Sequence, residues 1–207
     1  MRITKIEEQK KNKKKYSIYI DGEYHSSIDK EVLEELDFRE GMELNKDEFN
    51  KKMEIIQYKS ALRASLFILA HSSKTEKEII KKLKEKQHSD SAIKKVLEYL
   101  RELGYINDEN YADSFIRTVK DNTGTSRRSL YNKLASKGVD SEVIRQKLEE
   151  SDIDDYASAL KAAQKKLPGL KGNKSEKAAK LMGFLYRKGY GMDVCRRIIE
   201  ELELDEG

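Results

Sequence analysis

The sequence predicts a mainly α-helical protein in which three tandem three-helix repeats follow a small N-terminal α+β module. The prediction rests on a 51-residue period, on one alternating segment near the N-terminus, and on composition. Hydrophobic residues make up 37% of the 207 residues and charged residues 39%, which is more charge than an average globular domain carries. Thin layers of amphipathic helix, each burying one stripe, fit this composition better than a single thick core.

Residues 16–28 form the one segment with a clear β pattern. Tyr16, Ile18 and Ile20 alternate along it, and Asp21-Gly22 follows, which is a strong signal for a two-residue hairpin turn. Residues 23–26 would return as the second strand. Because an isolated hairpin is marginal in water, we expect it to pack against neighbouring helices.

Two helix starts follow the hairpin. Asp29 is placed to cap a short helix that ends near Gly41, and Asn45 with Glu48 is similar to a capping box. The second helix carries its apolar face on Phe49, Met53 and Ile56. We therefore interpret residues 1–58 as a small α+β module that begins with a flexible basic tip at residues 1–15 and continues with a β-hairpin and helices.

The sequence repeats itself after about residue 59. A shift of 51 residues aligns apolar positions, a lysine and a turn residue in three copies, namely Leu83/Leu134/Leu185, Lys86/Lys137/Lys188, Gln87/Gly138/Gly189, Ile93/Ile144/Cys195 and Leu97/Leu148/Ile199. A fixed period that recurs three times is typical of a stacked repeat array. The predicted repeats span residues 59–106, 107–153 and 154–207, the last with an acidic tail.

Each copy contains apolar spacing and capping signals for three helices. The expected features are a helix over 62–70, a capping box at Thr75/Glu78, caps at Ser89, Asn107 and Asp140, stops at Gly104 and Gly138, and helices over 156–167, 181–186 and 194–202. In the first copy, Leu103 is expected on the apolar face of the third helix with Leu100.

The net charge of +4 conceals a strong segregation of charge. Residues 1–15 carry +5, residues 21–50 carry −8, residues 156–199 carry +9 and residues 200–207 carry −5. A basic block of this strength suits a polyanion or an acidic protein surface. A solvated lysine-rich surface is the alternative explanation for any single lysine.

Several functional classes find no support in the sequence. No window approaches the run of about 18 apolar residues that a membrane span needs, and the basic N-terminus lacks a signal-type apolar stretch. The single Cys195 excludes an intramolecular disulfide and a multi-cysteine zinc site, so we expect a cytoplasmic protein. Neither metal-ligand histidine spacing nor a glycine-rich phosphate loop occurs. We therefore expect no metal, no cofactor and no enzymatic activity.

Two nucleic-acid motifs are ambiguous. The second and third helices of each copy are joined like a helix-turn-helix, but Glu142 and Asp193 would repel phosphates where a recognition helix begins. Tyr131, Tyr186 and Tyr190 lie near basic residues and are candidates for base stacking. Half-buried core tyrosines would have the same pattern.

Four stretches resemble the RecX family, and the resemblance covers about residues 60–202. They are TEKEIIKKL at 75–83, ELGYINDENYA at 102–112, the helix and turn from Arg127 to Val139, and FLYRKGY at 184–190. Residues 1–58 look like an extension found in some members. Ser73-Lys74 stands where the family usually has an arginine, and Ser129 replaces an acidic capping partner.

The resemblance implies an elongated, curved array of three three-helix repeats that binds the RecA recombinase on single-stranded DNA and inhibits it. Binding of double-stranded DNA stays open, and we expect a monomer. Our hypothesis is that basic residues of repeats two and three make the contact: Arg127, Arg128, Lys133, Lys137, Lys174, Lys177, Arg187 and Lys188. The alternatives are a stand-alone DNA-binding module and an adaptor scaffold that binds proteins through residues 1–58.

Overall fold

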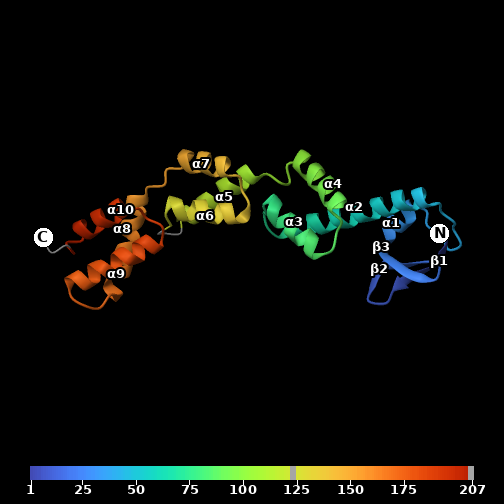
Figure 1. The fold of residues 1–207 in the computed structure, drawn as a ribbon, viewed down its shortest axis with the longest axis horizontal. Coiled ribbons are helices and arrows are strands. Elements are labelled where there is room, and N and C mark those ends of the chain that lie inside the picture. The colour runs from blue at the N-terminus through green and yellow to red at the C-terminus, as the bar shows by residue number, and fades with distance from the viewer. Residues whose placement is uncertain (122–124, 205–207) are drawn as a thin grey trace. The chain divides into compact units, whose positions relative to one another are not determined.

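The computed structural model describes residues 1–121 and 125–204. The chain divides into two compact units, Met1–Ile106 and Asn107–Gly207. In the first unit, strands β1 (Ile3–Gln9), β2 (Asn12–Ile20) and β3 (Glu23–Asp29) precede helices α1 (Lys30–Glu35), α2 (Lys46–His71), α3 (Glu76–Glu85) and α4 (Asp90–Glu102) (Figure 1). The prediction of a mainly helical chain with a small N-terminal α+β module is confirmed.

The three strands form one antiparallel sheet in the order β1-β2-β3. The turn predicted between β2 and β3 is present, with Asp21 at φ +50° and Gly22 at φ +91°. Two successive positive φ angles are the conformation that tight hairpin turns require, which explains the Asp-Gly pair.

The prediction of a flexible basic tip over residues 1–15 is wrong, because this segment forms β1 and the first part of β2. Ile6 pairs with Ile18 across the two strands, and Ile3 is almost fully buried. The charged side chains of β1 face solvent at the edge of the sheet, which conceals its strand character in the sequence. The pairing with β1 also explains how a marginal hairpin becomes stable.

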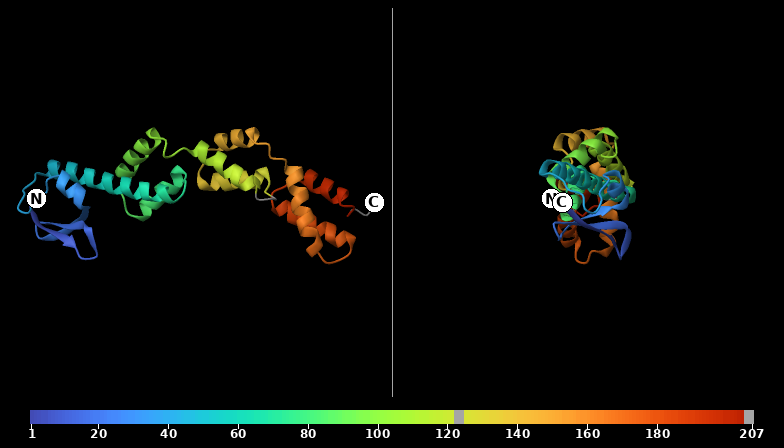
Figure 2. Two further views of the ribbon diagram at one scale, coloured as in Figure 1. Left: turned by 180° about the vertical axis from the view of Figure 1, so that it is seen from behind. Right: turned by 90° about the vertical axis from the view of Figure 1, so that its right-hand side faces the viewer.

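One face of the sheet packs on α1 and on the first half of α2, as two further views show (Figure 2). Their shared core includes Ile18, Ile28, Val32, Phe49 and Ile56. Phe49 and Ile56 come from the apolar helix face predicted after Asn45, so that prediction is confirmed.

Asp29 stands at the N-cap position of α1, but its side chain makes no capping bond. It forms an ion pair of 2.6 Å with Arg63 of α2, and Arg63 also pairs with Glu31 at 2.9 Å. The predicted capping role of Asp29 is therefore wrong, since the carboxylate instead ties the end of β3 to α2. The helix it precedes also ends earlier than expected, at Glu35 rather than near Gly41.

Helix α2 is continuous over 26 residues, whereas the sequence suggested two helices, one before and one after residue 58. Residues 57–62 contain neither glycine nor proline, so nothing interrupts the backbone hydrogen bonds there. The boundary that we placed after residue 58 consequently lies inside α2. The helix packs on the sheet with its first half and on α3 and α4 further along.

The predicted caps of α2 and α3 are both reciprocal capping boxes. The side chain of Asn45 accepts a hydrogen bond from the backbone N–H of Glu48 at 2.9 Å, and the backbone N–H of Asn45 donates to the Glu48 carboxylate at 3.2 Å. Thr75 and Glu78 repeat the arrangement at 3.3 and 3.2 Å. Each box satisfies two amides that a helix start leaves without partners.

The second unit contains six α-helices within its described residues and a short 3₁₀ turn at Leu167–Gly169. They are α5 (Asp108–Asp121), α6 (Arg127–Lys137), α7 (Ser141–Glu150), α8 (Asp155–Lys166), α9 (Lys174–Arg187) and α10 (Met192–Glu201). Nowhere in residues 1–121 and 125–204 is a helix both long and apolar enough to cross a membrane.

The 51-residue period corresponds to equivalent buried positions in the three helical repeats. Leu83, Leu134 and Leu185 are all fully buried. Ile93, Ile144 and Cys195 occupy the matching position on the third helix of each repeat, and all three are buried as well. Burial raises the pKa of the Cys195 thiol, as suits an apolar core position. The prediction that Leu103 lies on the apolar face of the third helix with Leu100 is wrong, because Leu103 is the C-cap residue of α4 and is 53% exposed.

The turn between the second and third helix of each repeat passes through a left-handed residue. Gly138 and Gly189 have φ +93° and +91°, and Gln87 holds the same position at φ +63°. Glycine adopts this conformation without steric cost, whereas a residue with a Cβ atom does not.

Replacement of Gln87 by glycine should therefore stabilise the first repeat. We expect Gln87→Gly to raise the free energy of unfolding by about 0.5 kcal/mol, since relief of the left-handed strain outweighs the greater freedom of glycine in the unfolded chain. Urea unfolding followed by far-ultraviolet circular dichroism measures the change. The reciprocal Gly138→Gln should lower stability, and a loss of stability on Gln87→Gly would contradict the explanation.

Candidate functional site

Repeats two and three meet where α6 begins and α9 ends, within the second unit. The Ser126 hydroxyl accepts a hydrogen bond from the Ser129 amide at 3.1 Å, which caps α6. The same hydroxyl donates to the Lys188 carbonyl at 2.8 Å. One buried side chain therefore starts one helix and fixes the end of another, 62 residues further along the chain.

Gly189 makes this close approach possible. A Cβ atom at Gly189 would lie 2.7 Å from the Ser126 hydroxyl oxygen and 3.7 Å from the Cβ of Arg128. Glycine is therefore required at this position for two reasons: the backbone is left-handed, and Ser126 leaves no room for a side chain.

This contact places the first turn of α6 beside the last turn of α9. Arg128 and Arg187 are both exposed there, and neither forms an ion pair with an acid in the described part of the chain. Lys188 lies next to them, with its ammonium nitrogen 5.4 Å from the centre of the Phe184 ring. Lys166, at the end of α8, lies 5.6 Å from the same ring. We call Arg128, Lys166, Arg187 and Lys188 the junction cluster.

Arg127 differs from Arg128 although the two are adjacent. Its side chain is half-buried and donates to the carbonyls of Ile153 and Ser151 at 3.0 and 3.1 Å. Its amide donates to the Asp155 carboxylate at 2.8 Å. Arg127 therefore holds the segment between α7 and α8 against α6. Its replacement would disturb the fold as well as the binding of a ligand.

The other candidate lysines lie apart from the junction cluster or make contacts of their own. Lys133 is exposed on α6, and the ammonium of Lys137 lies over the Tyr111 ring at 5.6 Å. Lys174 and Lys177 lie in the first turn of α9, roughly 15–20 Å from Arg187 at 1.5 Å per residue. The structure therefore brings together Arg128, Arg187 and Lys188 of the eight, and it adds Lys166, which the sequence analysis missed.

The aromatic residues near these cations divide into core and surface. Tyr190 is buried, its hydroxyl lies 2.9 Å from that of Ser158, and burial raises its pKa. Tyr131 packs against the core of repeat two. Tyr186 is 53% exposed beside Arg187, so it is the member of this set that offers an open ring face.

Several cations of the first unit are neutralised by nearby acids. Arg63, Arg101 and Lys95 pair with acids at 2.6, 2.7 and 3.1 Å. Ion pairs of this kind recur along α1, α2, α3 and α4. Across residues 1–121 and 125–204, no group of three or more His, Cys, Asp and Glu side chains is arranged to hold a metal ion.

The fold and the junction cluster define a class, a helical-repeat protein that presents a cluster of cations on its second unit. Four family models match the chain. One is described as the regulatory protein RecX N-terminal domain, over residues 1–45, and the others as the first, second and third three-helix domains of RecX, over residues 61–100, 107–148 and 152–199.

Curated relatives and solved structures agree with these models. Regulatory protein RecX of Clostridium beijerinckii is 34% identical over 97% of this chain and 95% of its own length, and that of Clostridium botulinum strain Eklund 17B is 30% identical over the same shares. A crystal structure of regulatory protein RecX has a TM-score of 0.69 at 27% identity and covers 96% of this chain and 98% of that chain. RecX from Lactobacillus salivarius has a TM-score of 0.63 at 26% identity, over 72% and 98%. The chain belongs to the RecX family.

A double-mutant cycle tests the contact between repeats two and three. Gly189→Ala should lower the free energy of unfolding by about 2 kcal/mol, through backbone strain and the clash with Ser126. Ser126→Ala should lower it by about 1 kcal/mol through the lost cap. Because Ser126→Ala removes the oxygen that clashes, the double variant should cost about 1 kcal/mol less than the sum. Urea unfolding measures all four proteins, and strict additivity would exclude the close contact.

Proposed function

We propose that this chain is a non-enzymatic regulator that binds the RecA recombinase and its filament on single-stranded DNA and restrains its recombination and ATPase activities. It would thereby limit recombinational repair and the DNA-damage response. The junction cluster is the observation that supports the proposal most directly. Its exposed arginines have no acidic partner among the described residues, so their charge is available to phosphates or to an acidic protein surface.

The chemistry of the cluster suits an irregular, single-stranded or protein-coated polyanion. Arginine binds phosphate and carboxylate groups through paired donors, and the exposed Tyr186 ring next to Arg187 can stack on a base. The third helices of repeats two and three begin near Glu142 and Asp193, which disfavours a recognition helix in a major groove.

The ATPase activity of RecA on single-stranded DNA provides the functional test. Titration of this protein well below one copy per recombinase should already inhibit hydrolysis, because each copy would act on a filament of many subunits. Absence of inhibition at one copy of this protein per recombinase would contradict the proposal. If the protein still bound bare DNA, with an affinity that falls steeply as salt rises, a stand-alone DNA-binding module would replace it. Binding of other proteins without either effect would favour the adaptor scaffold.

A charge-reversal pair locates the contact. Arg128→Glu with Arg187→Glu should weaken filament binding at least about tenfold, since two phosphate or carboxylate contacts become repulsive. Lys13→Glu with Lys94→Glu changes the net charge equally at exposed positions of the first unit and serves as the control. Fluorescence anisotropy of labelled filaments measures both. Equal losses in the two pairs would remove the junction cluster from the contact.

A further inference from the structure

An open groove runs between α2 and α4 in the first unit, with a volume of about 660 Å³. Its α2 side consists of Lys51, Glu54, Ile55 and Tyr58, which follow the i, i+3, i+4, i+7 spacing of one helix face. Ile55 is 38% exposed. This side therefore presents a partly apolar wall about two helical turns long.

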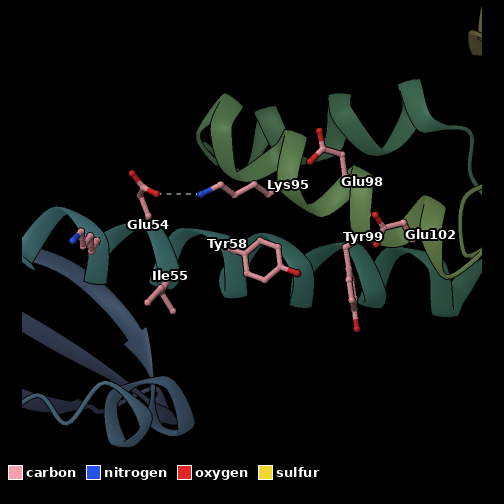
Figure 3. A pocket seen from close by; sticks show the side chains of 8 residues that line it. Glu54, Ile55, Tyr58, Lys95, Glu98, Tyr99 and Glu102 are labelled. Carbon is pink, nitrogen blue, oxygen red and sulfur yellow. Dashed lines mark hydrogen bonds and ion pairs between the residues drawn. The ribbon is translucent and has the colours of Figure 1, made fainter.

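The α4 side has the same spacing, with Lys95, Glu98, Tyr99 and Glu102 (Figure 3). Tyr99 is 41% exposed. Helices α2 and α4 pack against each other and line an open groove between them, and a groove of this kind can accept a further helix, as in helix-in-groove recognition.

The charge of the groove is uneven along its length. Lys95 pairs with Glu54 at 3.1 Å and is neutralised. Glu98 and Glu102 are exposed beside Tyr99 and form no ion pair within residues 1–121 and 125–204. Burial raises the pKa of Tyr58, and the neighbouring Tyr99 and Glu102 raise it further. The tyrosine end of the groove is therefore apolar inside and acidic at its rim.

The helix that forms one side of the groove is longer in the first repeat than its counterparts are. Helix α2 has 26 residues, whereas α5 and α8, its counterparts in repeats two and three, have 14 and 12. Glu54 and Ile55 belong to the extension of α2 that also carries the sheet on another face. The same extra turns of α2 therefore pack on the sheet and line one side of the groove.

We propose that this groove binds a basic helical segment of a protein partner, with an apolar side chain against Ile55 and Tyr99 and with Lys or Arg side chains facing Glu98 and Glu102. Two exposed hydrophobic residues supply the apolar contact, and the carboxylates select positive charge. The same carboxylates repel phosphates, which disfavours a nucleic acid as occupant. The inference goes beyond the proposed function and does not depend on it.

Binding of a designed peptide to the full-length chain tests the proposal without DNA or recombinase. The probe is a fluorescein-labelled 15-residue helical peptide, with leucines on one face and Lys and Arg beside them. The unaltered chain should bind it saturably, and should not bind a version with Glu in place of Lys and Arg. Absence of saturable binding to the unaltered chain overturns the proposal.

Three variants assign the binding to the groove. Glu98→Lys with Glu102→Lys should weaken the peptide about tenfold, and Tyr99→Ala should weaken it to a similar degree. Glu23→Lys with Glu149→Lys alters the same net charge at exposed positions elsewhere and should change the affinity by less than about twofold. Circular dichroism confirms that each variant is folded.

Two results would contradict the assignment. Equal weakening by both charge-reversal pairs would show diffuse attraction rather than a site. Sedimentation measures whether the unaltered chain self-associates. If it does, and if Tyr99→Ala abolishes the self-association, the occupant of the groove is a second copy of this chain instead. The peptide measurement and the ATPase measurement can fail separately, because neither uses the components of the other.

Discussion

The helical part of this protein depends on one recurring constraint, the left-handed turn between the second and third helix of each repeat. The turn allows a leucine near the end of the second helix to face the third helix across a very small core. Leu83, Leu134 and Leu185 are fully buried in this way. With so few apolar residues per repeat, each core depends on a handful of contacts, so the geometry of the turn matters more than it would in a large domain.

The junction between repeats two and three applies the same constraint to a second purpose. Gly189 ends α9 in the left-handed conformation, and its missing side chain leaves room for Ser126. Helices α2 and α3 begin with reciprocal capping boxes, whereas α6 begins with a cap made by Ser126 alone. The reason is that Ser129 stands where the other two helices have a glutamate. The Ser126 hydroxyl also donates to the Lys188 carbonyl. The start of α6 therefore has one capping hydrogen bond fewer than a capping box, and Ser126 instead links repeats two and three.

The charges of the two units are managed differently. In the first unit, many carboxylates and cations neutralise one another along the helices. Glu98 and Glu102, which form no ion pair within residues 1–121 and 125–204, border a partly apolar groove. In the second unit, Arg128 and Arg187 are exposed at the junction and form no ion pair with an acid among the described residues. Exposed ion pairs add little stability, so this distribution affects the choice of partner more than the strength of the fold.

The sequence by itself determined the repeats, most helix starts and the β2–β3 hairpin, because these follow from local spacing, capping residues and the Asp21-Gly22 turn. It could not reveal β1, whose charged side chains conceal an edge strand that only pairing with β2 stabilises. It also could not separate Arg127 from Arg128: backbone carbonyls more than 20 residues away engage the first and leave the second exposed. Lys166 joined the cluster only through Phe184 on another helix. Such assignments depend on which distant segments meet, and the tertiary structure alone decides this.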